Sequence, residues 1–74
     1  MTYNGWKNRA TWNVALWISN DAYLAAEAAC SHCYSDLVDT LRDMDITETP
    51  DKVAYNDTGL DIPRLDDLIK ELGQ

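Results

Sequence analysis

The chain has 74 residues, a formal net charge of −7 and no phenylalanine. This length fits one domain at most, and a substrate pocket of typical size, about 300–1,000 Å³, would occupy much of it. We therefore expect a single domain over residues 1–74 that binds another macromolecule, needs no cofactor and is not an enzyme. The negative charge disfavours direct contact with nucleic acid or membranes and favours basic partners.

The first predicted helix runs to about Ser19. Asn4-Gly5 before it is a turn signal, and the Asn8 side chain can accept hydrogen bonds from the free backbone amides at the helix start. Apolar residues lie on nearly all sides of this helix, so we expect it to be central and the most buried. We assign four of its residues mainly to the core: Trp12, Val14, Leu16 and Trp17.

Two further helices are expected after it. Asn20-Asp21 can cap a second helix that extends to about Tyr34 and is rich in alanine, which favours helix formation. Ser35 can cap a third helix that ends near Met44. The third helix has an apolar stripe at Leu37, Val38, Leu41 and Met44. Three carboxylates lie on its opposite side: Asp36, Asp39 and Asp43.

The remaining chain predicts a loop and a last helix. Residues 47–61 contain Pro50 and Gly59 and read as a loop, with a short extended segment near residues 52–55. Pro63 can start a helix that stops at Gly73. Its apolar residues have helical spacing: Leu65, Leu68, Ile69 and Leu72. These elements predict a mainly α fold, a compact domain of three to four helices.

The two cysteines lie in the run Cys30-Ser31-His32-Cys33. On a helix Cys30 and Cys33 would share a face and His32 would point away, whereas structural zinc takes four ligands. We interpret the cysteines as small, half-buried helix residues and expect no metal; a redox pair is the alternative. The sequence has no secreted disulfide framework, no signal peptide and no membrane span, so we expect the protein in the cytoplasm.

Acidic residues concentrate in the second part of the chain. Residues 1–34 are electrically balanced, and residues 35–74 carry the whole net charge of −7. Helix rise places Asp36 and Asp39 about 4.5 Å apart along the axis, and Asp39 and Asp43 about 6 Å, comparable to the distance between neighbouring phosphates. The alternative is that this face only keeps the protein soluble. We predict that the partner contacts a series of carboxylates: Asp36, Asp39, Asp43, Asp45, Glu48 and Asp51.

Several stretches resemble a known family. Residues 3–8 read YNGWKN and residues 11–21 read TWNVALWISND, and they resemble small phage, prophage and plasmid proteins with an NGWxNxxTWNVALWxxND signature. Residues 49–53 and 60–72 resemble the same family's ending, except that the resemblance implies glycine at Lys52. We interpret the polar residues of the signature as caps and side-chain-to-backbone contacts: Asn4, Asn8, Thr11, Asn13 and Asn20.

The resemblance implies an origin in a mobile genetic element. A small acidic protein of this kind resembles the anti-CRISPR and anti-restriction inhibitors of phages. We therefore expect a DNA mimic in the host cytoplasm that blocks a basic, nucleic-acid-binding surface of a host defence complex, specifically a CRISPR surveillance complex. The alternative is a host-takeover adaptor or assembly module whose apolar contact uses Tyr3, Trp6 or Tyr23. A regulator that depends on metal or redox chemistry at Cys30 and Cys33 is a third class.

Overall fold

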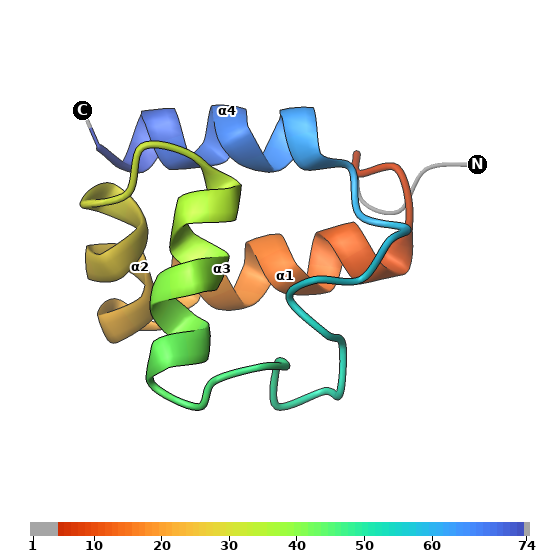
Figure 1. Ribbon diagram of the computed structural model, residues 1–74. Helices are drawn as coiled ribbons and strands as arrows, with labels where there is room; N and C mark the ends of the chain where they lie inside the picture. Colours follow the sequence, from red (N-terminus) through yellow and green to blue (C-terminus); the bar gives the residue numbers. More distant parts are fainter. Residues whose placement is uncertain (1–4, 74) are drawn as a thin grey trace.

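The computed structural model describes residues 5–73, which fold into four helices and their connections (Figure 1). The helices are α1 (Arg9–Asn20), α2 (Ala22–Ala29), α3 (Tyr34–Asp43) and α4 (Ile62–Leu72). α1 packs against α2 and α4, and α3 packs against the same two helices. The predicted mainly α domain is confirmed. Over the described residues, none of the helices is long and apolar enough to cross a membrane.

Asn8 caps the start of α1, as the sequence predicts. The Asn8 side chain accepts a hydrogen bond from the Thr11 backbone amide at 2.9 Å and donates one to the Gly59 carbonyl at 2.8 Å. Asp21 ends α1 and caps α2, because its side chain accepts from the backbone amides of Tyr23 and Leu24. Both caps are confirmed, and Asn8 also ties α1 to the segment before α4.

The predicted α4 is confirmed almost residue by residue. It begins at Ile62, so Pro63 is its second residue, where its lack of a backbone donor costs little. Gly73 is the C-cap. The apolar stripe faces the core, with Leu65 and Ile69 buried and Leu68 and Leu72 partly buried. A buried side chain of this size contributes about 1.5–3 kcal/mol to the free energy of unfolding.

The predicted boundary between the second and third helices is wrong. α2 ends at Ala29, and α3 begins at Tyr34 with Cys33 rather than Ser35 as its N-cap. The start of α3 is supported by a contact with α4. The backbone amide of Tyr34 donates a 2.7 Å hydrogen bond to Oδ1 of Asp66, so a carboxylate from another helix replaces the local cap. The side chain of Tyr34 is buried in the core. The chain changes direction between Ala29 and Tyr34, before this buried residue.

The largest side chains of the core are tyrosines, not tryptophans. Tyr34 and Tyr55 are each 2% exposed, and the Tyr34 hydroxyl donates to the Tyr55 carbonyl. Burial raises the pKa of both phenols. Aliphatic residues from all four helices and from the segment before α4 surround them: Val14, Ile18, Leu24, Leu37, Leu41, Val53, Leu60, Leu65 and Ile69.

The expectation for the tryptophans is therefore wrong in part. Val14 is fully buried, but Trp12, Leu16 and Trp17 are half-buried. An indole carries an N–H that needs a partner, which favours a place at the edge of a core rather than inside it. Trp17 shows this directly, because its Nε1 donates to the exposed carboxylate of Asp51.

Candidate interaction surface

The six predicted partner-binding carboxylates lie on α3 and on the hairpin that follows it. Five are exposed, and Asp36 is half-buried. Residues 36–57, which we call the acidic segment, hold seven carboxylates and two cations, so their net charge is −5. The exposed members of this segment are Asp39, Asp43, Asp45, Glu48, Asp51 and Asp57.

Asp36 and Asp39 each have a partner within the chain. Oδ2 of Asp36 accepts from the His32 backbone amide at 3.1 Å, so this carboxylate supports the start of α3. Asp39 forms a 2.6 Å ion pair with Arg42, and both side chains are more than 60% exposed. Such surface pairs contribute at most about 1 kcal/mol, so Asp39 can exchange Arg42 for a partner's cation at little cost.

Asp45 has a structural role that the sequence analysis did not identify. The Ile46 amide donates to the Leu41 carbonyl at 2.8 Å and the Asp45 amide to the Arg42 carbonyl at 3.0 Å. These two bonds are the Schellman pattern that closes a helix, and Asp45 occupies its left-handed position with φ 61°. The Asp45 carboxylate is exposed beside that of Asp43, at the end of α3.

A short hairpin follows the end of α3. The Thr49 amide donates to the Val53 carbonyl at 2.8 Å, and Glu48 pairs with Ala54 in an antiparallel bridge. The extended segment expected near residues 52–55 is therefore a hairpin arm only one bridge long. Lys52 ends the tight turn with φ 73°. Three-residue hairpin loops favour glycine at such a left-handed position, which explains why a glycine is expected there.

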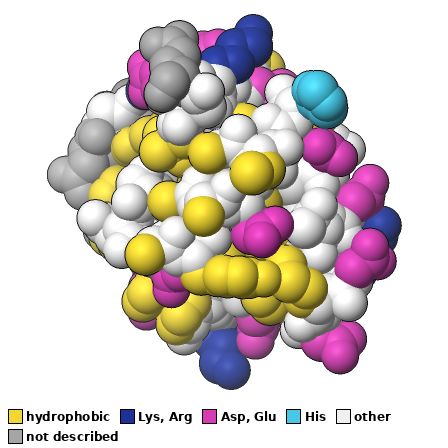
Figure 2. Space-filling model, turned by 90° about the vertical axis from the view of Figure 1, so that its left-hand side faces the viewer, with side chains coloured by type: hydrophobic (Ala, Val, Ile, Leu, Met, Phe, Trp, Pro, Cys, Tyr) yellow, Lys and Arg dark blue, Asp and Glu magenta, His cyan; other side chains and the backbone are white. Residues whose placement is uncertain are grey.

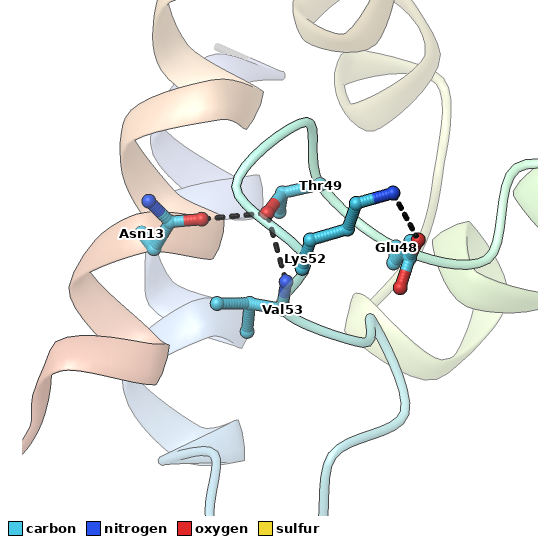
Figure 3. Close-up of polar contacts among 5 residues, drawn as sticks. All are labelled: Asn13, Glu48, Thr49, Lys52 and Val53. Atoms are coloured by element: carbon cyan, nitrogen blue, oxygen red, sulfur yellow. Dashed lines mark hydrogen bonds and ion pairs between the residues drawn. The ribbon is translucent and has the colours of Figure 1, made fainter.

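A buried group of polar side chains holds this hairpin against α1 (Figure 3). Asn13 and Thr49 are almost fully buried, and the Thr49 hydroxyl donates to Oδ1 of Asn13 at 2.7 Å. The same hydroxyl accepts from the Val53 amide at 3.1 Å. Oδ2 of Asp51 accepts from Nδ2 of Asn13 at 2.8 Å and from the Trp17 indole at 3.1 Å. We use the name hairpin cluster for the five residues that these bonds join: Asn13, Trp17, Thr49, Asp51 and Val53.

The hairpin cluster changes the interpretation of two residues. Asn13 was expected to bond backbone groups, but both ends of its amide contact side chains of the hairpin, so that expectation is wrong. Asp51 belongs to the predicted acidic series, yet one of its oxygens is committed to α1. The hydrogen bond from Asn13, followed by that from Trp17, lowers the pKa of Asp51. One signal for this contact was present in the sequence, since both stretches belong to the resemblance.

The other side of the hairpin is turned toward solvent. In Figure 3 Lys52 and Glu48 extend away from Asn13, and Nζ of Lys52 lies 3.5 Å from Oε1 of Glu48. The surface has one open groove at the hairpin and a second one beside α3. One has a volume of about 430 Å³ and lies between the α1–α2 junction and the hairpin. The other, about 340 Å³, lies between α3 and the segment before α4.

Of the aromatic residues expected to serve the alternative function, Tyr23 lies on α2 and Trp6 lies before α1. Figure 2 shows apolar side chains gathered over the α2 end of the molecule, with acidic side chains along the α3 edge. Tyr23 is 50% exposed, and its hydroxyl contacts the sulfur of Met44. Trp6 is half-buried beneath the guanidinium of Arg64, which lies 4.6 Å from the ring centre. Tyr3, like Asn4, lies outside the described residues.

The cysteines do not share a helix face, contrary to expectation. Cys30 is the C-cap of α2 and is exposed, whereas Cys33 is the N-cap of α3 and is half-buried. The early end of α2 separates them. Within residues 5–73, no three His, Cys, Asp or Glu side chains converge as ligands for a metal ion.

Comparison with known proteins identifies a family but no characterised relative. Residues 1–74 match the "Family of unknown function (DUF7249)", and the chain belongs to this family. No curated protein and no solved structure matches it.

Proposed function

We propose that this member of a family of unknown function is an inhibitor that binds a basic, nucleic-acid-binding surface of a host defence complex and blocks access of DNA. The observation that carries the proposal is the acidic segment, with six exposed carboxylates on α3 and on the chain that follows it to residue 57. Only Arg42 and Lys52 offset them, each in an exposed ion pair that a partner can replace. Such a surface attracts a basic partner and speeds encounter with it.

The specific target in this proposal is a CRISPR surveillance complex, and the protein acts in the cytoplasm of the host. The resemblance to phage and plasmid proteins supports a role against host defence, and a restriction enzyme is the other defence target. The hairpin cluster supports the proposal indirectly, because it fixes the hairpin on α1 and so holds Glu48 and Asp51 in place. A preorganised surface loses less entropy on binding.

The test is a DNA-binding assay with purified surveillance complexes and purified restriction enzymes. The wild-type protein should reduce DNA binding by one of them, and the effect should weaken as salt is raised. The double variant Asp39→Lys/Asp43→Lys should inhibit at least about tenfold less, because like charges then face each other. The matched control Asp67→Lys/Glu71→Lys makes the same charge change at exposed positions of α4 and should retain most inhibition.

Two results would reject this proposal. One is the absence of inhibition against every complex of both defence classes. The other is equal inhibition by the wild type and the Asp39→Lys/Asp43→Lys variant, with a folded variant verified by circular dichroism.

A second candidate function is supported by the exposed apolar face of α2. An adaptor or assembly module would bind a host protein there, with Tyr23 as its central contact. Tyrosine supplies a large, amphipathic contact area at protein interfaces. In this case Tyr23→Ala should abolish binding while Asp39→Lys/Asp43→Lys leaves it intact, and binding should be insensitive to salt.

A further inference from the structure

The larger groove combines apolar walls with carboxylates at its rim. Its volume is about 430 Å³, within the range of roughly 300–1,000 Å³ that is typical of ligand pockets. Trp17 and Tyr23 line it on the side of α1 and α2, and Ile46 and Pro50 line it on the side of the hairpin. The groove is open to solvent, and most of its lining surface is apolar.

Two carboxylates stand at this groove, Asp21 and Glu48. Asp21 is fixed, because its Oδ1 accepts from the Tyr23 and Leu24 amides at 2.9 and 3.1 Å as the cap of α2. Its Oδ2 takes no part in that cap. Glu48 lies on the hairpin arm, with its side chain 45% exposed. Both carboxylates are therefore available to a positively charged group in the groove.

We propose that this groove receives an arginine side chain from a basic segment of the partner protein. The inference rests on the proposed function, since it names the anchor for the same basic partner. A guanidinium group can stack on an aromatic face and donate paired hydrogen bonds to a carboxylate at the same time. The aromatic walls and the rim of this groove provide both elements. A lysine ammonium lacks the flat surface and the fork of donors.

Within residues 5–73, no arginine or lysine stacks on an aromatic ring of this groove. Arg64 lies over Trp6, but no cation of the described residues lies over Trp17 or Tyr23. The indole of Trp17 is held in one orientation by its bond to Asp51. The second groove differs in this respect: its tyrosines, Tyr34 and Tyr55, are 2% exposed and present no ring face to a ligand. This difference favours the first groove.

Lys52 acts as an internal competitor for the same position. It also lines the groove, and its ammonium lies 3.5 Å from the Glu48 carboxylate with the side chain 80% exposed. An incoming arginine has to displace it. Removing the charge of Lys52 should therefore strengthen binding more than removing an equal charge elsewhere.

The test uses two peptides of glycine and serine, one with three arginines and one with three lysines at the same positions. Both are titrated into the wild-type protein at low salt, and the indole N–H of Trp17 is followed by NMR. The arginine peptide should bind about three- to fivefold more tightly, the factor expected for an exposed cation–aromatic contact. Its largest chemical shift changes should fall on Trp17 and Tyr23.

Matched variants separate the groove from general electrostatic attraction. Tyr23→Ala and Glu48→Gln should remove the preference for arginine. Asp43→Asn removes one charge outside the groove, so it should weaken both peptides equally and keep the preference. Lys52→Gln should strengthen the arginine peptide more than Lys70→Gln, which removes the same charge from α4.

The outcomes are distinct from those of the defence assay. Equal affinity for the two peptides, or equal effects of Glu48→Gln and Asp43→Asn, would reject the groove even if the protein inhibits a defence complex. Tight binding of single arginine amide would also reject it, because the site would then suit a small guanidinium ligand. Self-association lost in Tyr23→Ala would assign the groove to a second copy. An arginine preference without any inhibition would reject only the proposed target.

Discussion

The indole of Trp17 and the carboxylate of Asp51 are joined by a 3.1 Å hydrogen bond across 34 residues of sequence. Asn13, one helical turn before Trp17, shares the same carboxylate oxygen. The stretch TWNVALWISND and the stretch TPDKV therefore meet in space. The first stretch forms α1, and the second forms the hairpin that packs on it. The polar residues of the two stretches are therefore hydrogen-bond partners of one another.

Replacing Asn13 with alanine should destabilise the protein by about 2–3 kcal/mol. The change removes one buried and one partly buried hydrogen bond and leaves the Thr49 hydroxyl without its acceptor. Urea denaturation followed by circular dichroism measures the loss. Asn20→Ala is the matched control at the exposed end of the same helix and should change stability by less than about 0.5 kcal/mol. Similar losses in the two variants would contradict the importance of the hairpin cluster.

The contribution of Asp51 to stability should depend on pH in a defined direction. Hydrogen bonds from Asn13 and Trp17 lower its pKa in the folded state. Its contribution is thus complete above the pKa of an unfolded aspartate, about 3.9, and is lost as the pH falls through the lowered folded value. The stability gap between wild type and Asp51→Asn should be constant from pH 7 to about 5 and shrink below pH 4. A gap that widens in acid would exclude this network.

Lys52→Gly should stabilise the protein by about 0.5–1 kcal/mol. A side chain at φ 73° costs about 1–2 kcal/mol, and the greater freedom of glycine in the unfolded chain offsets part of that gain. Thermal unfolding at fixed pH measures the effect. Lys52→Ala keeps the Cβ atom and removes only the exposed pair with Glu48, so it should be close to neutral. If alanine stabilised as much as glycine, the charge of Lys52 would be the cause.

Asp66→Ala should cost about 1 kcal/mol, the usual value of an N-cap, although Asp66 lies on a different helix from the one it caps. Asp67→Ala removes a neighbouring, exposed carboxylate and serves as the control. Amide exchange adds a local measurement: the Tyr34 amide should lose protection in the Asp66 variant and keep it in the control. Unchanged exchange at Tyr34 in both variants would contradict the cap.

The accuracy of the sequence predictions follows the range of the interactions involved. α4 and the start of α1 depend on local signals, namely Pro63 with its apolar spacing and the Asn8 side chain bonding three residues ahead. The sequence predicts too long a second helix, because no proline or glycine lies between Ala29 and Tyr34. The start of α3 depends on Asp66, which lies 32 residues after Tyr34. Neither the residues around Tyr34 nor those around Asp66 carry a local pattern that predicts this hydrogen bond.

The predictions for the candidate site also depend on whether a feature is local or involves distant residues. The clustering of carboxylates along the chain predicts a partner-binding surface; the structure shows that most of them are exposed, as charged side chains generally are. The separate roles of Asp36, Asp45 and Asp51 as cap, helix-end residue and hairpin contact could not be read from spacing. Each depends on backbone geometry or on a distant partner, and so does the groove beside Trp17.

The polar side chains at and near the start of α1 have hydrogen-bond partners that lie about 35–50 residues later in the sequence. The Thr49 hydroxyl donates to Asn13, and the Asp51 carboxylate accepts from Asn13 and Trp17. The Gly59 carbonyl accepts from Asn8, the N-cap of α1. At a synthesis rate of about 5–20 residues per second, roughly two to eight seconds separate the addition of Asn20, the last residue of α1, from that of Gly59. Until the hairpin is synthesised, Asn13 and Trp17 lack their native partners, so α1 can reach its final packing only after most of the chain has been made.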